Sequence, residues 1–267
     1  MNVSSILIAI DLNNSNEEVL KFSFKIAERL GAKLTFSNCY HPRLRKGQLT
    51  HTKESRLEDL ESAVAEVAVS SEIRDYNCVV IEALAGDAIL VQLNSGIYDL
   101  LIIGSHPSSS IVSFKSIAAN LIEQTSIQTI VLPAHFKMID LSHVVFNLEF
   151  EFREIYKIFE LLDFCASFSA FLSCVHFCTE KQRYEAEDNL KTYNMLYESY
   201  SKEKLSFELV VSDKLKGLNH YAKECEADMV VMFKSRKTWK NQYLAPAEEK
   251  LMQIVDIPML ITDNHPR

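Results

Sequence analysis

The chain has 267 residues, of which 48% are apolar and 24% charged, with a formal net charge of −8. This length corresponds to about two domains, and the apolar share is enough for two packed cores. The acidic balance argues against a nucleic-acid-binding surface, and because no run reaches about 18 apolar residues the sequence predicts no membrane span.

The first half alternates between patterns of strand and helix. Five short apolar runs predict strands that are covered on both faces, at Ile6–Ile10, Leu34–Tyr40, Cys78–Leu84, Leu100–Ile103 and Ile130–Leu132. Between them, apolar residues at helical spacing predict four helices, marked by Val19, Phe22, Ile26 and Leu30, by Leu57, Leu60, Val64 and Val67, by Ile89, Leu90 and Leu93, and by Ile117, Leu121 and Ile122. Asn13–Asn16 offers cap chemistry to the first helix, and Gly31 ends it.

The second half follows the same order. It predicts strands at Val144–Leu148, Phe168–Phe177, Phe207–Val211, Met229–Met232 and Met259–Ile261. It predicts helices at Ile155–Phe164, at Glu180–Lys204, and over the stripe of Leu215, Leu218, Tyr221, Ala222 and Cys225.

The two halves also share short segments about 130 residues apart. Asp99–Gly104 returns as Asp228–Phe233, and Ser126–Leu132 returns as Asp256–Thr262. A repeat of this length fits a whole domain. We therefore predict one domain over residues 1–136 and a second over residues 137–267.

Strict alternation of strands and helices predicts an α/β fold with right-handed crossovers and parallel sheets. We expect two tandem doubly wound domains, each with a five-stranded sheet in the order 3-2-1-4-5 and helices on both faces. Such sheets bind ligands where the strand order reverses, at the carboxyl ends of the strands. Asp11 directly follows strand one and Gly104 directly follows strand four, so we expect both residues at this crevice.

The start of the chain and its cysteines bear on its compartment. After Met1 the sequence enters a strand, without a basic segment ahead of an apolar stretch and without a cleavage site. The six cysteines are scattered through apolar runs, which is typical of reduced, buried thiols. We expect a cytoplasmic protein.

Three segments of the first half, Ile6–Asp11, Ile26–Leu34 and Asp99–His106, resemble the universal stress protein family. The resemblance covers the chain as a tandem pair and is weaker in the second half. In that family an Asp at the end of strand one contacts the adenine of ATP, and a loop reading Gly-x2-Gly-x9-Gly-Ser holds the phosphates. The resemblance thus implies a nucleotide site at Asp11, Gly104, Ser105, His106, Lys115, Ser116 and Ile117.

This loop is only partly retained. Gly104 matches the first glycine, but Pro107 stands at the second and Lys115 at the third, in a loop one residue shorter. Proline removes an N–H donor and fixes the backbone. Either the protein kept the fold and lost the nucleotide, or Lys115 and the hydroxyls of four nearby serines hold a phosphate or another anion; these are Ser105, Ser108, Ser109 and Ser110.

The second half departs further. The acid after strand one is at best Glu149, and Phe233 replaces the first glycine. An aromatic ring there fills the space that adenine needs, so we predict no tight ATP binding in this half. The basic segment Lys234–Lys240 is either a solvated edge or a site for an anion or partner.

Two other groups of residues are candidates for a metal or catalytic site. Cys174, His176 and Cys178 alternate on one strand and could contribute zinc ligands, but they span about 13 Å, so packing is favoured over metal binding. His41 and His106 could both lie at the first crevice, yet no serine or cysteine with an orienting acid accompanies them. The sequence contains no nucleophile elbow, Walker loop or paired-carboxylate motif, so we expect no catalytic residue.

The favoured hypothesis is a non-catalytic stress-response protein that acts through protein contacts, with weak or altered nucleotide or anion binding in the first domain. The alternative is an ATP- or AMP-binding sensor, or a weak ATPase, that uses the same crevice. No cofactor is expected otherwise. The apolar fifth strands Ile130–Leu132 and Met259–Ile261 predict either a homodimer or pairing of the two domains within the chain, because exposed apolar edges are otherwise unprotected.

Overall fold

A computed structural model of the protein describes residues 3–14, 16–41, 44–45, 48–49, 51–104, 114–137, 140–152, 154–199, 204–234 and 256–262. The chain divides into two compact units, residues 2–138 and residues 139–267, here called the first and second domain. Each domain is described by itself.

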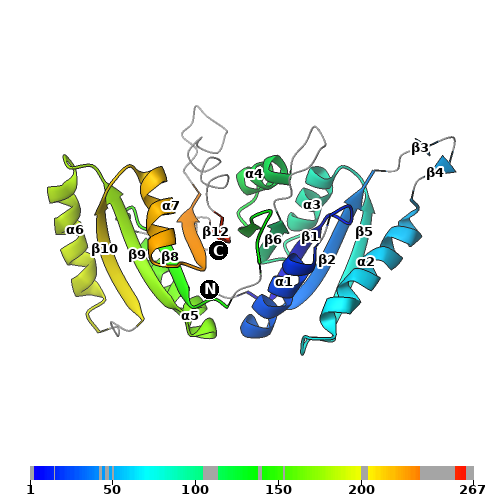
Figure 1. The fold of residues 1–267 in the computed structure, drawn as a ribbon, viewed down its shortest axis with the longest axis horizontal. Helices are drawn as coiled ribbons and strands as arrows, with labels where there is room; N and C mark the ends of the chain where they lie inside the picture. The colour runs from blue at the N-terminus through cyan, green and yellow to red at the C-terminus, as the bar shows by residue number, and fades with distance from the viewer. Residues whose placement is uncertain are drawn as a thin grey trace. The chain divides into compact units, whose positions relative to one another are not determined.

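The first domain is a five-stranded parallel sheet between two helical layers (Figure 1). Its elements are β1 (Ser5–Ile10), α1 (Glu17–Leu30), β2 (Lys33–Tyr40), β3 (Leu44–Arg45), β4 (Gln48–Leu49), α2 (Lys53–Ala68), β5 (Tyr76–Glu82), α3 (Ala85–Leu93), β6 (Leu100–Gly104), α4 (Phe114–Gln124) and β7 (Gln128–Leu132). The sheet runs β5-β2-β1-β6-β7, and every pairing in it is parallel. Helix α1 packs against α2, and α3 against α4. The predicted order 3-2-1-4-5 is confirmed.

The second domain repeats this arrangement. Its elements are β8 (His143–Asn147), α5 (Glu154–Phe168), β9 (Phe171–Cys178), α6 (Arg183–Leu196), β10 (Leu205–Val211), α7 (Lys214–Glu224), β11 (Met229–Phe233) and β12 (Met259–Thr262). The sheet runs β10-β9-β8-β11-β12 with parallel pairings. The tandem doubly wound fold is therefore confirmed in both halves.

The continuous apolar runs are strands buried on both faces. In β1, Ile6, Leu7 and Ile8 have no exposed surface. A doubly wound sheet needs this pattern, because helices cover both of its sides. Gly31 ends α1 with φ = 67°, a left-handed conformation that a glycine adopts without a steric penalty.

The connection after β2 contains the short antiparallel pair β3–β4, where the sequence analysis predicted no element. Three local predictions were wrong. Asn16 precedes α1 but its side chain does not cap the helix; its Nδ2 donates instead to the carbonyls of Asp11 and Asn14, both at 2.8 Å.

The other two corrections concern the second domain. Helix α5 continues to Phe168, whose ring lies 4.9 Å from that of Phe164, and β9 starts only at Phe171. Apolar residues in the last turn of a helix look like the start of a strand in sequence, which explains the error. Helix α6 covers Arg183–Leu196, not the whole of Glu180–Lys204.

Asp99 and Asp228, which occupy the same place in the two repeated segments, have the same structural role in their domains. In the first domain, one carboxylate oxygen of Asp99 accepts hydrogen bonds from the backbone N–H and hydroxyl of Ser4, at 2.9 and 2.7 Å. It also accepts the N–H of Ser5 at 3.1 Å. The residue before β6 therefore fixes the start of its neighbour β1.

Asp228 does the same before β11. Its Oδ2 accepts the N–H and hydroxyl of Ser142, at 2.7 and 2.6 Å, and the N–H of His143 at 2.8 Å. The sequence repeat thus preserves a hydrogen-bonded connection between strands one and four of each sheet.

We expect Asp99→Ala and Asp228→Ala each to lower the free energy of unfolding by about 1–3 kcal/mol, because two backbone N–H groups lose a charged acceptor. Urea denaturation measures the change. Asp75→Ala is the control, since Asp75 is exposed and makes no hydrogen bond within the described residues. Equal stability of all three variants would contradict this role.

Candidate functional site

The first crevice lies at the carboxyl ends of β1 and β6, which are hydrogen-bonded neighbours. Ala9 of β1 pairs with Ile103 of β6, so Asp11 and Gly104 come at the same edge of the sheet. The strand order reverses here, because β2 and β5 lie on one side of β1 whereas β6 and β7 lie on the other. Doubly wound folds bind ligands at this place. The structure therefore brings together these two residues of the predicted site.

The carboxylate of Asp11 is already bound by its own loop. Its Oδ1 accepts the backbone N–H of Asn13 at 3.1 Å and the Asn13 side-chain N–H at 2.7 Å. Its Oδ2 accepts the side-chain N–H of Asn14 at 2.7 Å. An adenine amino group would have to compete with these three donors.

The remaining residues of the predicted site are only partly within the described structure. Ser105 and His106 lie outside it, as does Pro107. Lys115 and Ser116 lie in the first turn of α4, and Ile117 follows them on the same helix. Backbone N–H groups at such a helix start can bind an anion, which is how the family loop would use this position.

In the second domain, aromatic residues follow or end the corresponding strands β8 and β11. Phe233 ends β11 and packs against the fully buried Phe146 of β8, with ring centroids 5.4 Å apart in an edge-to-face arrangement. Phe150 follows β8 with φ = 60° and lies 4.4 Å from the ring of His176. Sequence analysis anticipated Phe233 but missed Phe150.

The loop after β8 also binds an internal carboxylate. Glu154 has no exposed surface, and its oxygens accept the N–H of Glu149 at 3.0 and 3.1 Å and the N–H of Glu151 at 2.8 Å. Burial raises the pKa of Glu154 to about 8, against the opposite effect of these N–H donors. Its position in the first turn of α5 was the only available signal, and sequence analysis missed it.

The Cys/His group on β9 is used in packing. Cys174 and Cys178 are buried, and burial raises the pKa of both thiols. The thiolate that a metal would need is thereby disfavoured. His176 donates from Nδ1 to the Leu148 carbonyl at 2.8 Å. Within the described residues no three His, Cys, Asp or Glu side chains come together as metal ligands.

His41 directly follows β2, while its expected companion His106 lies outside the described residues. The six cysteines are all unpaired thiols. Among the described helices, none has both the length and the apolar character that a membrane crossing needs.

The comparisons with known proteins agree with this fold. Residues 2–133 match the universal stress protein family. A search of curated protein sequences found no match.

Solved structures extend the likeness to the whole chain. A functionally unknown protein from Pseudomonas aeruginosa PAO1 is 15% identical over 98% of this chain and 92% of its own, with a TM-score of 0.69. A universal stress protein from Archaeoglobus fulgidus is 14% identical over 97% and 96%, with a TM-score of 0.65. The cytoplasmic domain of a prokaryotic cation chloride cotransporter is 11% identical over 98% and 96%, with a TM-score of 0.58.

At these identities the structures show the fold alone, whereas the sequence match of the first half shows the family. The protein belongs to the universal stress protein family, as a tandem member with the family's sequence in residues 2–133 and its fold in both halves.

Proposed function

We propose that the protein is a non-catalytic stress-response protein that acts through protein contacts, with weak or altered nucleotide or anion binding in the first domain. The observation that carries this proposal is the state of Asp11. The residue that would read adenine has both carboxylate oxygens bound by Asn13 and Asn14. Pro107 and Lys115, in place of two loop glycines, support the same conclusion.

The second domain supports the proposal independently. Phe233, which stands in place of the family's first loop glycine, packs against Phe146, and Glu154 already binds the loop N–H groups. In both domains a carboxyl group of the chain itself already accepts the N–H groups of the loop after the first strand. A phosphate gains little at such a loop, because those donors are already taken.

We also propose that the protein works in a reducing compartment, the cytoplasm, because its six thiols are unpaired. The outer strands β7 and β12 of the two sheets remain candidates for a homodimer interface or for pairing within the chain. Light scattering gives the mass that separates a dimer from a monomer.

Calorimetric titration of the intact protein with ATP, AMP and inorganic phosphate tests the proposed function. We expect weak or absent heats for ATP and AMP, since binding must first displace Asn13 and Asn14 from Asp11. Lys115→Ala should remove any heat that arises from a phosphate group at the α4 start. Tight ATP binding that Asp11→Ala abolishes would instead favour the nucleotide sensor, and product release under turnover conditions would favour a weak ATPase.

A further inference from the structure

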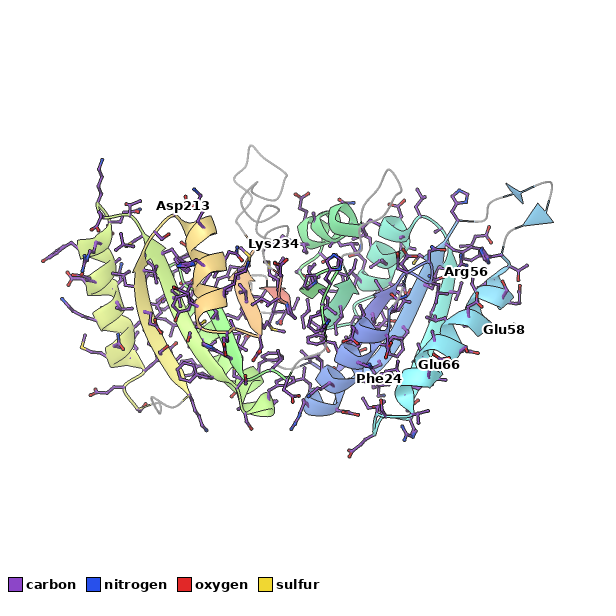
Figure 2. The ribbon with its side chains drawn as sticks, viewed as in Figure 1. Phe24, Arg56, Glu58, Glu66, Asp213 and Lys234 are labelled. Carbon is purple, nitrogen blue, oxygen red and sulfur yellow. The ribbon has the colours of Figure 1, made fainter. Side chains whose placement is uncertain are left out.

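A groove of about 890 Å³ separates α1 from α2 in the first domain. Its walls come from the loop after β1, from α1 and from one face of α2. Arg56 lines it near the start of α2, and Glu66 lies farther along the same helix (Figure 2). The groove shares Asn13 and Asn14 with the loop that binds Asp11, and its other walls are formed by α1 and α2.

Arg56 is buried, and the described residues give its side chain no acidic partner. The residue is 7% exposed, and its Nη2 donates to the Oδ1 of Asn13 at 3.2 Å. Its Nε is buried and makes no hydrogen bond to any residue that the structure describes. Within the described part of the chain, no carboxylate oxygen lies within 4.0 Å of its guanidinium.

Two other arginines show what a satisfied guanidinium looks like here. Arg74, in the loop after α2, donates to the carbonyls of Ala68, at 2.8 Å, and of Ser71. Arg183 on α6 pairs with Glu187 at 2.9 Å. Among the described residues Arg56 has neither kind of compensation, since the partner of its guanidinium there is the neutral amide oxygen of Asn13. Removing a charge from water without an opposite charge is costly, and a bound anion would offset that cost.

The rest of the groove indicates how such a ligand would be oriented. His51, which directly precedes the N-cap of α2, also lines the groove. Its ring and the Arg56 guanidinium can both donate hydrogen bonds into this space. Asp59 and Glu66 line the groove farther along α2. An anionic group would bind at the Arg56 end, and a part of the ligand with N–H or O–H donors would lie toward the carboxylates.

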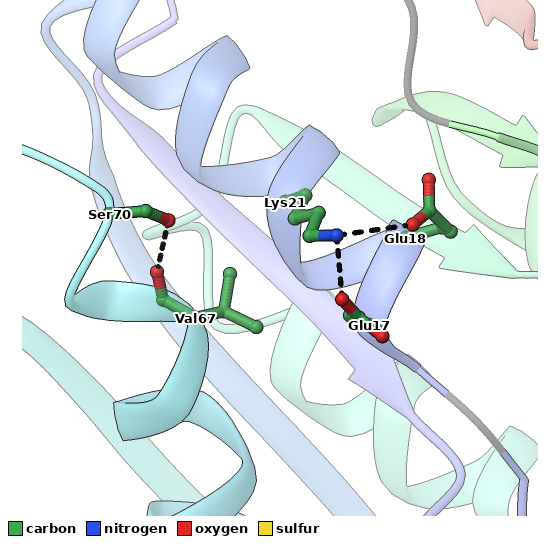
Figure 3. A network of polar contacts seen from close by, with 5 residues as sticks. All are labelled: Glu17, Glu18, Lys21, Val67 and Ser70. Carbon is green, nitrogen blue, oxygen red and sulfur yellow. Dashed lines mark hydrogen bonds and ion pairs between the residues drawn. The ribbon is translucent and has the colours of Figure 1, made fainter.

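The wall formed by α1 contributes a lysine, but the charge of this lysine is paired within the same helix. Lys21 of α1 lies between Glu17 and Glu18, with its Nζ 2.6 and 3.4 Å from their carboxylate oxygens (Figure 3). Its charge is therefore already balanced. On the α2 side, the Ser70 hydroxyl donates to the Val67 carbonyl at 2.8 Å. Unlike Lys21, Arg56 has no carboxylate partner among the described residues.

We propose that Arg56 anchors an oxyanion-binding site in this groove, which takes the phosphate or carboxylate group of a small polar metabolite. The planar guanidinium suits either group, because its N–H donors match two oxygens at once. The site lies beside the crevice of the proposed function and shares Asn13 with it, but its binding group is Arg56 rather than Asp11 or the start of α4.

Nitrogen-15 NMR of the intact protein tests the site, with inorganic phosphate as the probe and acetate as a second arm. We expect the Arg56 Nε–H resonance, assigned by its loss in Arg56→Lys, to shift and saturate with phosphate. A saturable shift with both probes indicates an oxyanion site in general, and one with phosphate alone indicates a phosphate site. This readout needs only wild-type protein once the resonance is assigned.

Variants then locate the binding. We expect Arg56→Lys to weaken phosphate binding about tenfold, because the fork of donors is lost. Asp59→Asn should strengthen it about threefold, because a nearby like charge is removed. Arg74→Lys is the matched control and should leave the affinity unchanged.

No saturable shift of the Arg56 resonance in wild-type protein would overturn the proposal. Equal phosphate affinity in wild type and Arg56→Lys would also overturn it. Phosphate binding that Lys115→Ala weakens and Arg56→Lys does not would place the anion at the start of α4, in favour of the crevice and against this site.

Discussion

Glu154→Gln is expected to remove most of the pH dependence of the second domain's stability between about pH 4.5 and 8. Burial raises the pKa of Glu154 from 4.5 to about 8 in the folded protein. Between these values the folded chain holds a proton that the unfolded chain has released, so the free energy of unfolding falls as the pH rises. The contribution is complete below about pH 4.5 and is lost above about pH 8.

The difference in unfolding free energy between wild type and Glu154→Gln should therefore change by roughly 2–4 kcal/mol across this window. Urea denaturation at several pH values measures it, and Glu185→Gln, at an exposed position of α6, serves as a control. Glu154→Ala should destabilise at every pH, because the N–H groups of Glu149 and Glu151 lose their acceptor. A constant difference between wild type and Glu154→Gln would contradict the raised pKa.

The second large effect concerns the aromatic core of the second domain. We expect Phe146→Ala to lower the free energy of unfolding of the second domain by about 3–5 kcal/mol, because a fully buried ring leaves a cavity. Phe146→Leu, which nearly conserves the volume, should cost less than about 1.5 kcal/mol. Loss of the contact with Phe233 accounts for part of the difference.

The expected signature is a shift of one unfolding transition. Each domain has its own sheet and core, so Phe146→Ala should lower the midpoint of the second domain, and Ile8→Ala that of the first. Scanning calorimetry of the intact protein resolves the two midpoints. Equal shifts of both transitions in each variant would show that the domains do not unfold independently.

The fold could be read from the sequence because the signals for it are local and repeated. Continuous apolar runs such as Ile6–Ile10 can only be buried strands in a chain of alternating elements, and Gly31 marks a helix end. The errors fall where one pattern fits two structures. The run around Phe168 is apolar in either a helix or a strand, and the segment after β2 is too short and polar to reveal a hairpin.

The candidate site was less predictable because side-chain contacts decide it. The sequence placed Asp11 and Gly104 at one edge of the sheet, and the strand pairing agrees. It did not indicate that Asn13 and Asn14 would bind the Asp11 carboxylate, since asparagine after a strand is equally common in turns and caps. Nor did it single out Glu154 or Arg56, because charged residues in the first turns of helices are usually exposed.

The most direct test of the central claim is to analyse what the purified protein carries. The intact chain, isolated without added nucleotide, is denatured, and the released small molecules are separated and quantified. Our account predicts no stoichiometric adenine nucleotide, because Asp11 is bound by Asn13 and Asn14. In the second domain, Phe233 stands in place of the first loop glycine and packs against Phe146. One mole of ATP or AMP per mole of protein, absent from Asp11→Ala, would contradict it.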